Sequence, residues 1–245
     1  MMKTSIRLVM FLRSFAIQGS WNYRTLIGNG FAFAILPALR EIYRDRSELE
    51  GGVARHTELF NSHPYLVGVA LGAVSELEAQ HADPRTIERF KSAVRSSLGS
   101  IGDSLVWAAW RPACALLGLT VVFAGAPWWA GPLVYLVAYN AGTLALRIWS
   151  FRIGFRHAQG VGAVLRRAHL DRVQHAAAGA GAFLLGVVLP LVLANGTGMP
   201  VSWPWIGAAI VAAVLGLRFG TAARTPILAA GAVVLILGLL FGLRP

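Results

Sequence analysis

Acidic residues are scarce in this chain and almost absent from its second part. Ten of the eleven aspartates and glutamates lie at or before residue 103, and Asp171 is the eleventh. Charged residues of either sign make up only 13% of the 245 residues, hydrophobic residues make up 56%, and the mean hydropathy is +0.60. A soluble domain has about 25% charged residues. The scarcity of charge therefore excludes an ordinary soluble domain and indicates a protein of the lipid bilayer.

Cysteine is equally scarce. The single cysteine, Cys114, lies in an apolar stretch, so the chain can form no internal disulfide and has no thiol-based metal motif. His56, Glu58 and His63 do not have the spacing of a standard ligand set, so we expect no metal. The sequence also has no nucleophile elbow and no phosphate-binding loop. We therefore expect no cofactor and no enzymatic activity in this chain.

Basic residues are more frequent and give a formal net charge of +11. After residue 103 they gather in two connectors between apolar stretches, 147–175 and 218–224. Arginine-rich connectors lie on the cytoplasmic side of membrane proteins, whereas nucleic-acid-binding proteins carry a basic face on a soluble module. The pattern argues against nucleic acid as a partner and puts both connectors in the cytoplasm. The N-terminus is then expected inside and the C-terminus outside.

Long apolar stretches follow residue 103. Crossing the hydrocarbon core of a bilayer takes about 20 apolar residues, and a helix satisfies the backbone polar groups of such a segment. Five stretches are long enough or nearly so: 105–124, 128–146, 176–195, 198–217 and 225–243. The sequence therefore predicts an all-α integral membrane protein, with a transmembrane helical bundle of about five helices in residues 104–245.

The first 103 residues form a different region, which we expect to be amphipathic and re-entrant. In residues 3–18, polar side chains follow one helical face and apolar side chains the opposite face, which is typical of a helix on a membrane surface. The polar residues are Lys3, Arg7, Ser14 and Gln18, and the apolar ones are Leu8, Phe11, Leu12 and Phe15. The apolar stretches 27–39, broken by Pro37, and 65–74, after Pro64, are too short to span. We expect re-entrant or interfacial segments there, within one folded unit.

Six short motifs occur in order through the first 140 residues. They are FLRSF-x-x-QGSWN (11–22), GFAFA-x-x-PALR (30–40), RH-x-E-x-FN-x-HPY (55–65), LE (77–78), IGDS-x-x-W-x-x-x-RP (101–112) and GP-x-x-x-x-x-x-YN (131–140). In content, order and spacing they resemble the IID membrane subunit of the mannose/fructose/sorbose family of the bacterial phosphotransferase system. The later helices are similar to that family only in hydropathy.

The resemblance implies a function and a set of partners. A IID subunit pairs with a IIC-type subunit in a higher hetero-oligomer, which carries a hexose across the bacterial inner membrane. Separate cytoplasmic IIA and IIB proteins relay phosphate on histidines and phosphorylate the sugar. The resemblance thus implies a multi-pass transport subunit that is not itself phosphorylated.

Two departures from the family pattern lie beside the expected sugar path. The family usually carries a Gly-Pro-containing segment similar to MGPLAG before the IGD piece, where this chain reads RSSLGS at 95–100. The residue after Glu78, often a second glutamate, is Ala79. These departures keep a second hypothesis open: a transport-incompetent IID-like scaffold, or a regulatory membrane protein that signals to phosphotransferase components.

Polar and aromatic residues near the apolar stretches are the candidates for contacting a sugar, because a hexose presents hydroxyls on an apolar ring. Asp103 and Trp107 are four residues apart and would share a helical face, and Arg111 continues the series. Ionisable residues within membrane segments default to a functional role, so we expect Asp103 to bind substrate, and we expect the Trp107 indole to pack on the apolar face of the sugar ring. We expect Arg111 to be structural. In the alternative interpretation Asp103 is structural as well, and Arg111 neutralises a carboxylate of another segment and fixes helix packing.

Four further candidates come from the N-terminal region. Gln18, Trp21 and Asn22 lie where the surface helix turns into the membrane, and we expect them to contact substrate, although asparagine also caps helices well. Glu78 ends the second short stretch and is also expected to bind substrate, with solvation at the membrane interface as the alternative.

Three other polar residues are expected to be structural. Asn61 and His63 would hydrogen-bond backbone groups that are freed where the chain turns at Pro64. Asn140 lies in the middle of an uncharged stretch and would join neighbouring helices through a hydrogen bond.

Overall fold

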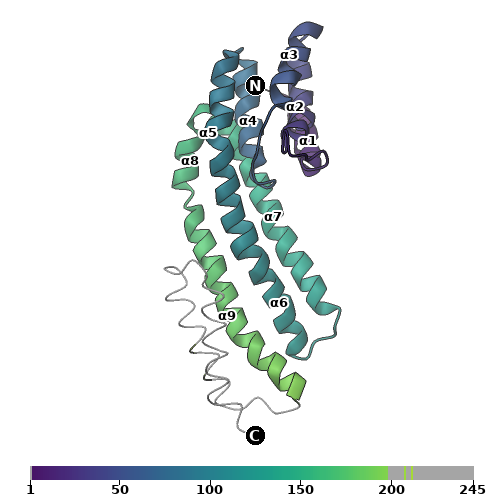
Figure 1. Cartoon of the computed structure of the whole chain (residues 1–245), viewed down its shortest axis with the longest axis vertical. Coiled ribbons are helices and arrows are strands. Elements are labelled where there is room, and N and C mark those ends of the chain that lie inside the picture. The colour runs from purple at the N-terminus through teal and green to yellow at the C-terminus, as the bar shows by residue number, and fades with distance from the viewer. Residues whose placement is uncertain (1, 198–206, 208–210, 212–245) are drawn as a thin grey trace. The chain divides into compact units, whose positions relative to one another are not determined.

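The computed structural model describes residues 2–197, 207 and 211, and within these residues the regular structure is entirely helical (Figure 1). Isolated bridges join Asn22 to Leu26 and Leu26 to Phe60. The helices are α1 (Thr4–Arg13), η1 (Ser14–Ala16), α2 (Gly28–Ile42), α3 (Arg46–Thr57), α4 (Val67–Ala79), α5 (Pro84–Gly102), the π-helical η2 (Asp103–Trp110), α6 (Arg111–Phe123), α7 (Ala130–His157), η3 (Ala158–Gly160), α8 (Val161–Arg167) and α9 (Leu170–Thr197).

The chain divides into two compact units. Unit 1 comprises Met1–Asp103 and Thr143–His169, and unit 2 comprises Ser104–Gly142 and Leu170–Pro245. Helix α7 therefore contributes its first part to unit 2 and its second part to unit 1. The division into 1–103 and 104–245 that we expect from the sequence stays a prediction.

Helix α1 and the following η1 of unit 1 are amphipathic, and several of their apolar side chains are exposed. Leu8, Leu12 and Phe15 are each more than half exposed. The cations are bound by the protein instead: Lys3 pairs with Glu41 at 2.7 Å, and Arg7 lies 3.9 Å from Glu76. A helix with this arrangement needs an apolar environment on its outer side.

Helix α2 continues through Pro37, so the expectation that this proline breaks the stretch 27–39 is wrong. A proline inside a helix cannot donate a hydrogen bond to the carbonyl four residues earlier, which here is the carbonyl of Phe33. The guanidinium of Arg13 donates to that oxygen at 3.1 Å and also lies over the Phe33 ring. Arg13 therefore satisfies the acceptor that the proline leaves without its helical partner.

Helix α4, expected as a short re-entrant stretch at 65–74, is a 13-residue helix buried inside unit 1. It packs closely against the second part of α7 because glycines of both helices lie at the contact, and a Cβ on Gly154 of α7 would lie 2.5 Å from the carbonyl oxygen of Gly68. A Cβ on Gly68 would lie 2.6 Å from Phe151, and a Cβ on Gly72 would lie 2.4 Å from the backbone nitrogen of Phe155. Small residues four apart permit this close approach of helix backbones.

Unit 2 includes α6 and the first part of α7. A Cβ on Gly118 of α6 would lie 2.7 Å from the carbonyl of Gly131, so α6 and the first part of α7 also pack closely. Among the described residues, two helical runs are long and apolar enough to cross a membrane, Pro84–Phe123 and Val161–Val192. They include nearly all of the expected span 105–124 and most of 176–195. The expected span 128–146 lies mainly in α7 and stays a prediction, and those at 198–217 and 225–243 lie almost wholly outside the described residues.

Candidate functional site

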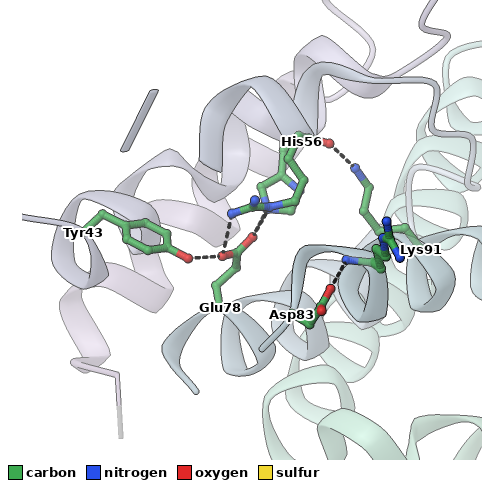
Figure 2. Close-up of polar contacts among 7 residues, drawn as sticks. Tyr43, His56, Glu78, Asp83 and Lys91 are labelled. Atoms are coloured by element: carbon green, nitrogen blue, oxygen red, sulfur yellow. Dashed lines mark hydrogen bonds and ion pairs between the residues drawn. The ribbon is translucent and has the colours of Figure 1, made fainter. Parts of the chain in front are cut away.

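A buried carboxylate, Glu78, lies at the centre of a polar cluster in unit 1 (Figure 2). Its Oε2 accepts a hydrogen bond from the Tyr43 hydroxyl and one from Nη2 of Arg55 at 3.2 Å. Its Oε1 accepts from Nε of Arg55 at 3.0 Å and lies 2.8 Å from Nε2 of His56. Four donors therefore surround a carboxylate that is completely removed from solvent, and this burial excludes the alternative that Glu78 is solvated at an interface.

The hydrogen bonds to Glu78 bring together the end of α2, the end of α3 and α4. Tyr43 follows α2, Arg55 and His56 lie in the last turn of α3, and Glu78 lies near the end of α4. Helix α3 begins at its N-cap Asp45, whose carboxylate accepts from the backbone nitrogen of Glu48. These local features place the end of α3 over Glu78.

Lys91 brings α5 into the same cluster. Its side chain is 5% exposed, and Nζ donates to the Arg55 carbonyl at 2.8 Å (Figure 2). The ammonium also lies over the rings of Phe31 and Phe60, at 5.5 and 5.8 Å. A cation at the C-terminal end of a helix is favourable, so Lys91 stabilises the end of α3.

The hydrogen bonds decide the charge state of the cluster. Burial alone would raise the pKa of Glu78, but the bonds from His56, Tyr43 and Arg55 lower that pKa to about 2. Burial lowers the pKa of His56, and burial together with Glu78 raises the pKa of Tyr43 to about 12. Glu78 is therefore ionised while His56 is neutral and donates from Nε2. The Nδ1 of His56 is buried and finds no hydrogen-bond partner in the described part of the chain.

Sequence reasoning found Glu78 but missed the residues that hold it. Arg55 is adjacent to His56 in the RH-x-E motif, and this motif is the signal that could have identified it. Nothing in the sequence indicates Tyr43. Within the described residues, no group of three or more histidines, cysteines or carboxylates could hold a metal ion. Because both oxygens of Glu78 already accept protein donors, the cluster can fix the helices of unit 1. Whether Glu78 also binds substrate stays a prediction.

The loop between η1 and α2 contains the other N-terminal candidates. Oδ1 of Asn22 accepts from the backbone nitrogens of Arg24 and Thr25, at 3.0 and 2.9 Å, and Nδ2 donates to Thr25 Oγ1 at 2.8 Å. Asn22 thus folds the turn with its own side chain. Trp21 is 46% exposed and makes an edge contact with Tyr23, and Gln18 is exposed. Gln18 and Trp21 are therefore accessible, while the amide of Asn22 is used by the turn.

The HPY segment (His63–Tyr65) precedes α4 and contacts Gly102, the last residue of α5. His63 is 2% exposed, its Nδ1 accepts from the backbone nitrogen of Tyr65 at 3.4 Å, and its carbonyl accepts from Leu66 and Val67. Burial and the nearby Arg147 lower the pKa of His63 to about 4. His63 therefore helps to fold the turn that begins α4, whereas Asn61 is exposed.

Asp103 begins the π-helical segment that sequence reasoning did not anticipate. Hydrogen bonds in a π-helix join residues five apart, and such segments are frequent at functional sites. Asp103 is exposed at the edge of unit 1, and within the described residues no ion pair involves it. In unit 2, Trp107 is 38% exposed, and the guanidinium of Arg111 lies over its ring at 5.6 Å. Trp107 and Arg111 thus do share a face, and Asp103 and Trp107 both remain accessible.

Asn140 lies in the part of α7 that belongs to unit 2. Its Nδ2 donates to the Leu136 carbonyl of the same helix at 2.7 Å. This bond stays within α7, and the expected role of Asn140 between helices stays a prediction.

The described geometry can now be compared with known proteins. The family model of the PTS system mannose/fructose/sorbose family IID component matches residues 2–205, which include every candidate residue above. The chain belongs to this family. The resemblance inferred from the six motifs is therefore confirmed, and IID components are membrane subunits of sugar transporters.

Named relatives of this IID chain take different sugars. The mannose-specific EIID component of Escherichia coli K12 is 30% identical over 186 residues, which are 74% of this chain and 65% of that protein. The sorbose-specific EIID component of Klebsiella pneumoniae is 29% identical over 185 residues, which are 74% of this chain and 67% of that protein. The fructose permease IID component of Bacillus subtilis is 25% identical, with 74% and 66% covered. The IID chain thus spans about two thirds of the length of these relatives.

Two solved structures share the fold of the IID chain. A chain in the cryo-EM structure of the mannose transporter ManYZ with microcin E492 aligns with a TM-score of 0.60 at 23% identity, covering 99% of this chain and 98% of that one. A second structure, described as a membrane protein, aligns with a TM-score of 0.68 at 24% identity, covering 98% and 97%. At these identities the likeness establishes the fold.

The departure at 95–100 lies in the continuous helix α5 of the IID chain. Arg95 is half-buried and borders a cavity of about 310 Å³. The cavity is lined by Glu58, Leu59, Glu88, Lys91, Ser92 and Arg95. Arg95, in the segment RSSLGS, therefore lies in a polar surface pocket beside the Glu78 cluster.

Proposed function

We propose that this chain carries a hexose of the mannose/fructose/sorbose class across the bacterial inner membrane together with a IIC-type subunit. The observation that carries the proposal is the family match over residues 2–205. Separate cytoplasmic IIB and IIA proteins phosphorylate the sugar in this proposal, and the membrane chains form a higher hetero-oligomer. This chain provides part of the path and no phosphoryl-transfer chemistry.

The residues proposed to contact the sugar are Asp103, Trp107, Gln18 and Trp21. Each residue is accessible and is proposed on its own chemistry: the Asp103 carboxylate and the Gln18 amide for hydroxyls, and each indole for the apolar face of the ring. Asn22 and Glu78, which we expected to bind substrate, take a supporting role in this proposal because their polar atoms are occupied by protein groups.

The exposed apolar side chains of α1 support a place for unit 1 at the membrane. The two helical runs that can cross a bilayer support the same proposal for the whole chain. The arginine-rich connector 147–175 then faces the cytoplasm, with the N-terminus inside and the C-terminus outside.

A second candidate function is a transport-incompetent scaffold or regulator. The observation in its favour is that α5 runs unbroken from Pro84 to Gly102, through the positions where the family usually has a Gly-Pro pair. A proline there would interrupt or bend the helix. A sensor that only binds phosphotransferase proteins would tolerate this stiffer helix.

Co-expression separates the two candidates. The chain and its IIC-type partner are expressed with the IIA and IIB proteins in cells that lack other hexose carriers, and uptake of labelled mannose, fructose and sorbose is measured. Transport predicts accumulation of at least one sugar phosphate that is lost when this chain is omitted. A complex that assembles in normal amount but carries none of these sugars would support the scaffold.

A further inference from the structure

Arg147 is an arginine that the charge pattern assigns to a cytoplasmic connector but that the fold buries. Its side chain is 4% exposed and lies in the part of α7 that belongs to unit 1. An arginine that only orients the chain in the membrane would be solvated, as the exposed Arg152 of the same helix is. Burying an arginine costs free energy unless protein groups replace water. Orienting the chain in the membrane therefore does not explain why Arg147 is buried.

The groups around Arg147 come from two sequence motifs. Its Nη1 donates to the carbonyl of Ser14 at 2.8 Å and to Ser14 Oγ at 3.0 Å, at the C-terminal end of α1. Its guanidinium lies over the rings of Phe15 and Tyr65, at 4.4 and 5.1 Å. Among the residues that the structure describes, no carboxylate forms an ion pair with it. A helix-end carbonyl, a hydroxyl and two aromatic faces hold the cation instead.

A chain of contacts leads from Arg147 to Asp103. Tyr65 lies against His63, with ring centroids 5.2 Å apart and its backbone nitrogen bonded to His63 Nδ1. His63 in turn packs against Gly102, where an added Cβ would lie 2.1 Å from the His63 Cβ. Asp103 is the next residue and starts the π-helical segment. Each contact in this series lies within unit 1.

We propose that Arg147 is a positioning residue: it fixes the HPY turn against Gly102 and thereby fixes the place of the Asp103 carboxylate. The significance for transport rests on the proposed function, in which Asp103 contacts the sugar. The positional effect itself does not depend on transport, so the two can be tested separately.

The first test measures the position of residue 103 directly. Asp103→Cys is made in a Cys114→Ser background, and the labelling rate of the new thiol with a soluble maleimide is followed in the assembled membrane complex. Adding Arg147→Gln should change this rate several-fold, and Arg147→Lys, which keeps the charge but loses the planar fork, should give an intermediate rate. Arg152→Gln is the matched control and should leave the rate unchanged. An unchanged rate with Arg147→Gln overturns the proposal, whether or not the protein transports sugar.

A milder variant covers the case in which Arg147→Gln prevents assembly. Ser14→Ala removes the hydroxyl acceptor but keeps the backbone acceptor, and it should shift the labelling rate in the same direction as Arg147→Lys. Gly102→Ala, which must displace His63, should also shift the rate. If neither Ser14→Ala nor Arg147→Lys changes it, the proposal is wrong.

The second test asks whether Arg147 acts through Asp103. Uptake per assembled complex is measured for Asp103→Asn, Arg147→Gln and the double variant. A misplacement of about 1 Å can cost about 100-fold in rate, so Arg147→Gln should lower uptake by about 10- to 100-fold. The double variant should be no worse than the worse single one, because coupled residues are not additive. Losses that multiply would show that Arg147 acts by another route. Absence of uptake by the unaltered protein would refute the proposed function, while the labelling result would still decide the role of Arg147.

Discussion

Glu78 and Arg147 are both buried in unit 1, but the protein holds the two charges in opposite ways. Glu78 accepts four donors, two of them from a guanidinium, so its charge is balanced within the cluster. Arg147 lies against a carbonyl, a hydroxyl and two rings, and no carboxylate among the described residues balances it. A closed network of the first kind is suited to holding helices together. A cation with neutral partners is more sensitive to the geometry of those partners.

The largest expected effect comes from breaking the closed network. Glu78→Gln removes the charge that Arg55 and His56 are bonded to and leaves Arg55, whose side chain is only 20% exposed, without its ion pair. Removing one partner of a buried pair typically costs about 3–5 kcal/mol, so the melting temperature of the purified complex should fall strongly. Glu50→Gln, which removes the exposed pair with Arg46, is the control and should cost less than about 1 kcal/mol. Equal melting temperatures for the two variants would contradict the description of the Glu78 cluster.

A smaller effect is expected at Arg13, which also binds a carbonyl, as Arg147 does. Arg13→Gln leaves the Phe33 carbonyl without its donor and should destabilise the protein by about 1–3 kcal/mol. In a Pro37→Ala background the helix supplies its own donor to Phe33, so the same change should cost much less. Chemical unfolding of the four variants measures this difference. Equal costs in both backgrounds would show that Arg13 does not compensate for Pro37.

Removing the Tyr43 hydroxyl is expected to lower the stability still less. It tests how the stabilisation is divided among the donors to Glu78. Tyr43→Phe removes one of four donors to Glu78, so the expected loss is about 0.5–1.5 kcal/mol. Thermal unfolding of Tyr43→Phe and of Glu78→Gln, measured side by side, gives the fraction of the cluster's stabilisation that the Tyr43 hydroxyl contributes. A loss as large as that of Glu78→Gln would mean that the remaining three bonds do not hold the carboxylate.

The pH dependence of stability should be gradual. The pKa of His56 and that of His63 are both lowered by burial, so the unfolded chain binds protons that the folded chain does not, and stability falls as the pH drops below about 6.5. The pKa of Glu78 is about 2 in the fold, so its contribution is complete above about 4.5 and declines as the pH falls towards 2. Melting temperatures between pH 7.5 and pH 5 should decrease, with a shallower slope for His56→Gln. If His56→Gln leaves this slope unchanged, a group other than His56 causes the pH dependence.

The sequence predicted the helical class and two of the five spans in a form that the structure supports, because long apolar stretches in lipid have few alternatives to a helix. It failed at Pro37, where the acceptor that the proline frees is satisfied by Arg13, a residue far away in the chain. It also failed at Arg147, because a count of positive charges cannot distinguish a solvated arginine from one that the fold buries.

The residues expected to contact the sugar stay predictions. Asp103, Trp107 and Trp21 are exposed, and the π-helical segment at Asp103 could not be predicted from the spacing of side chains. The partners of Glu78 come from two other segments, the end of α2 and the last turn of α3, and their convergence depends on how α2, α3 and α4 pack. Local spacing could not reveal Tyr43 for this reason.

Asp103→Asn tests the central claim most directly. The variant keeps the size of the side chain but removes a charge-assisted hydrogen bond, which is about twice as strong as a neutral one. Uptake per assembled complex is measured beside the amount of complex, with the exposed Asp171→Asn as control. If Asp103 lies on the sugar path, the complex forms in normal amount while uptake falls strongly, and Asp171→Asn transports normally. Normal uptake and normal assembly with Asp103→Asn would contradict the claim.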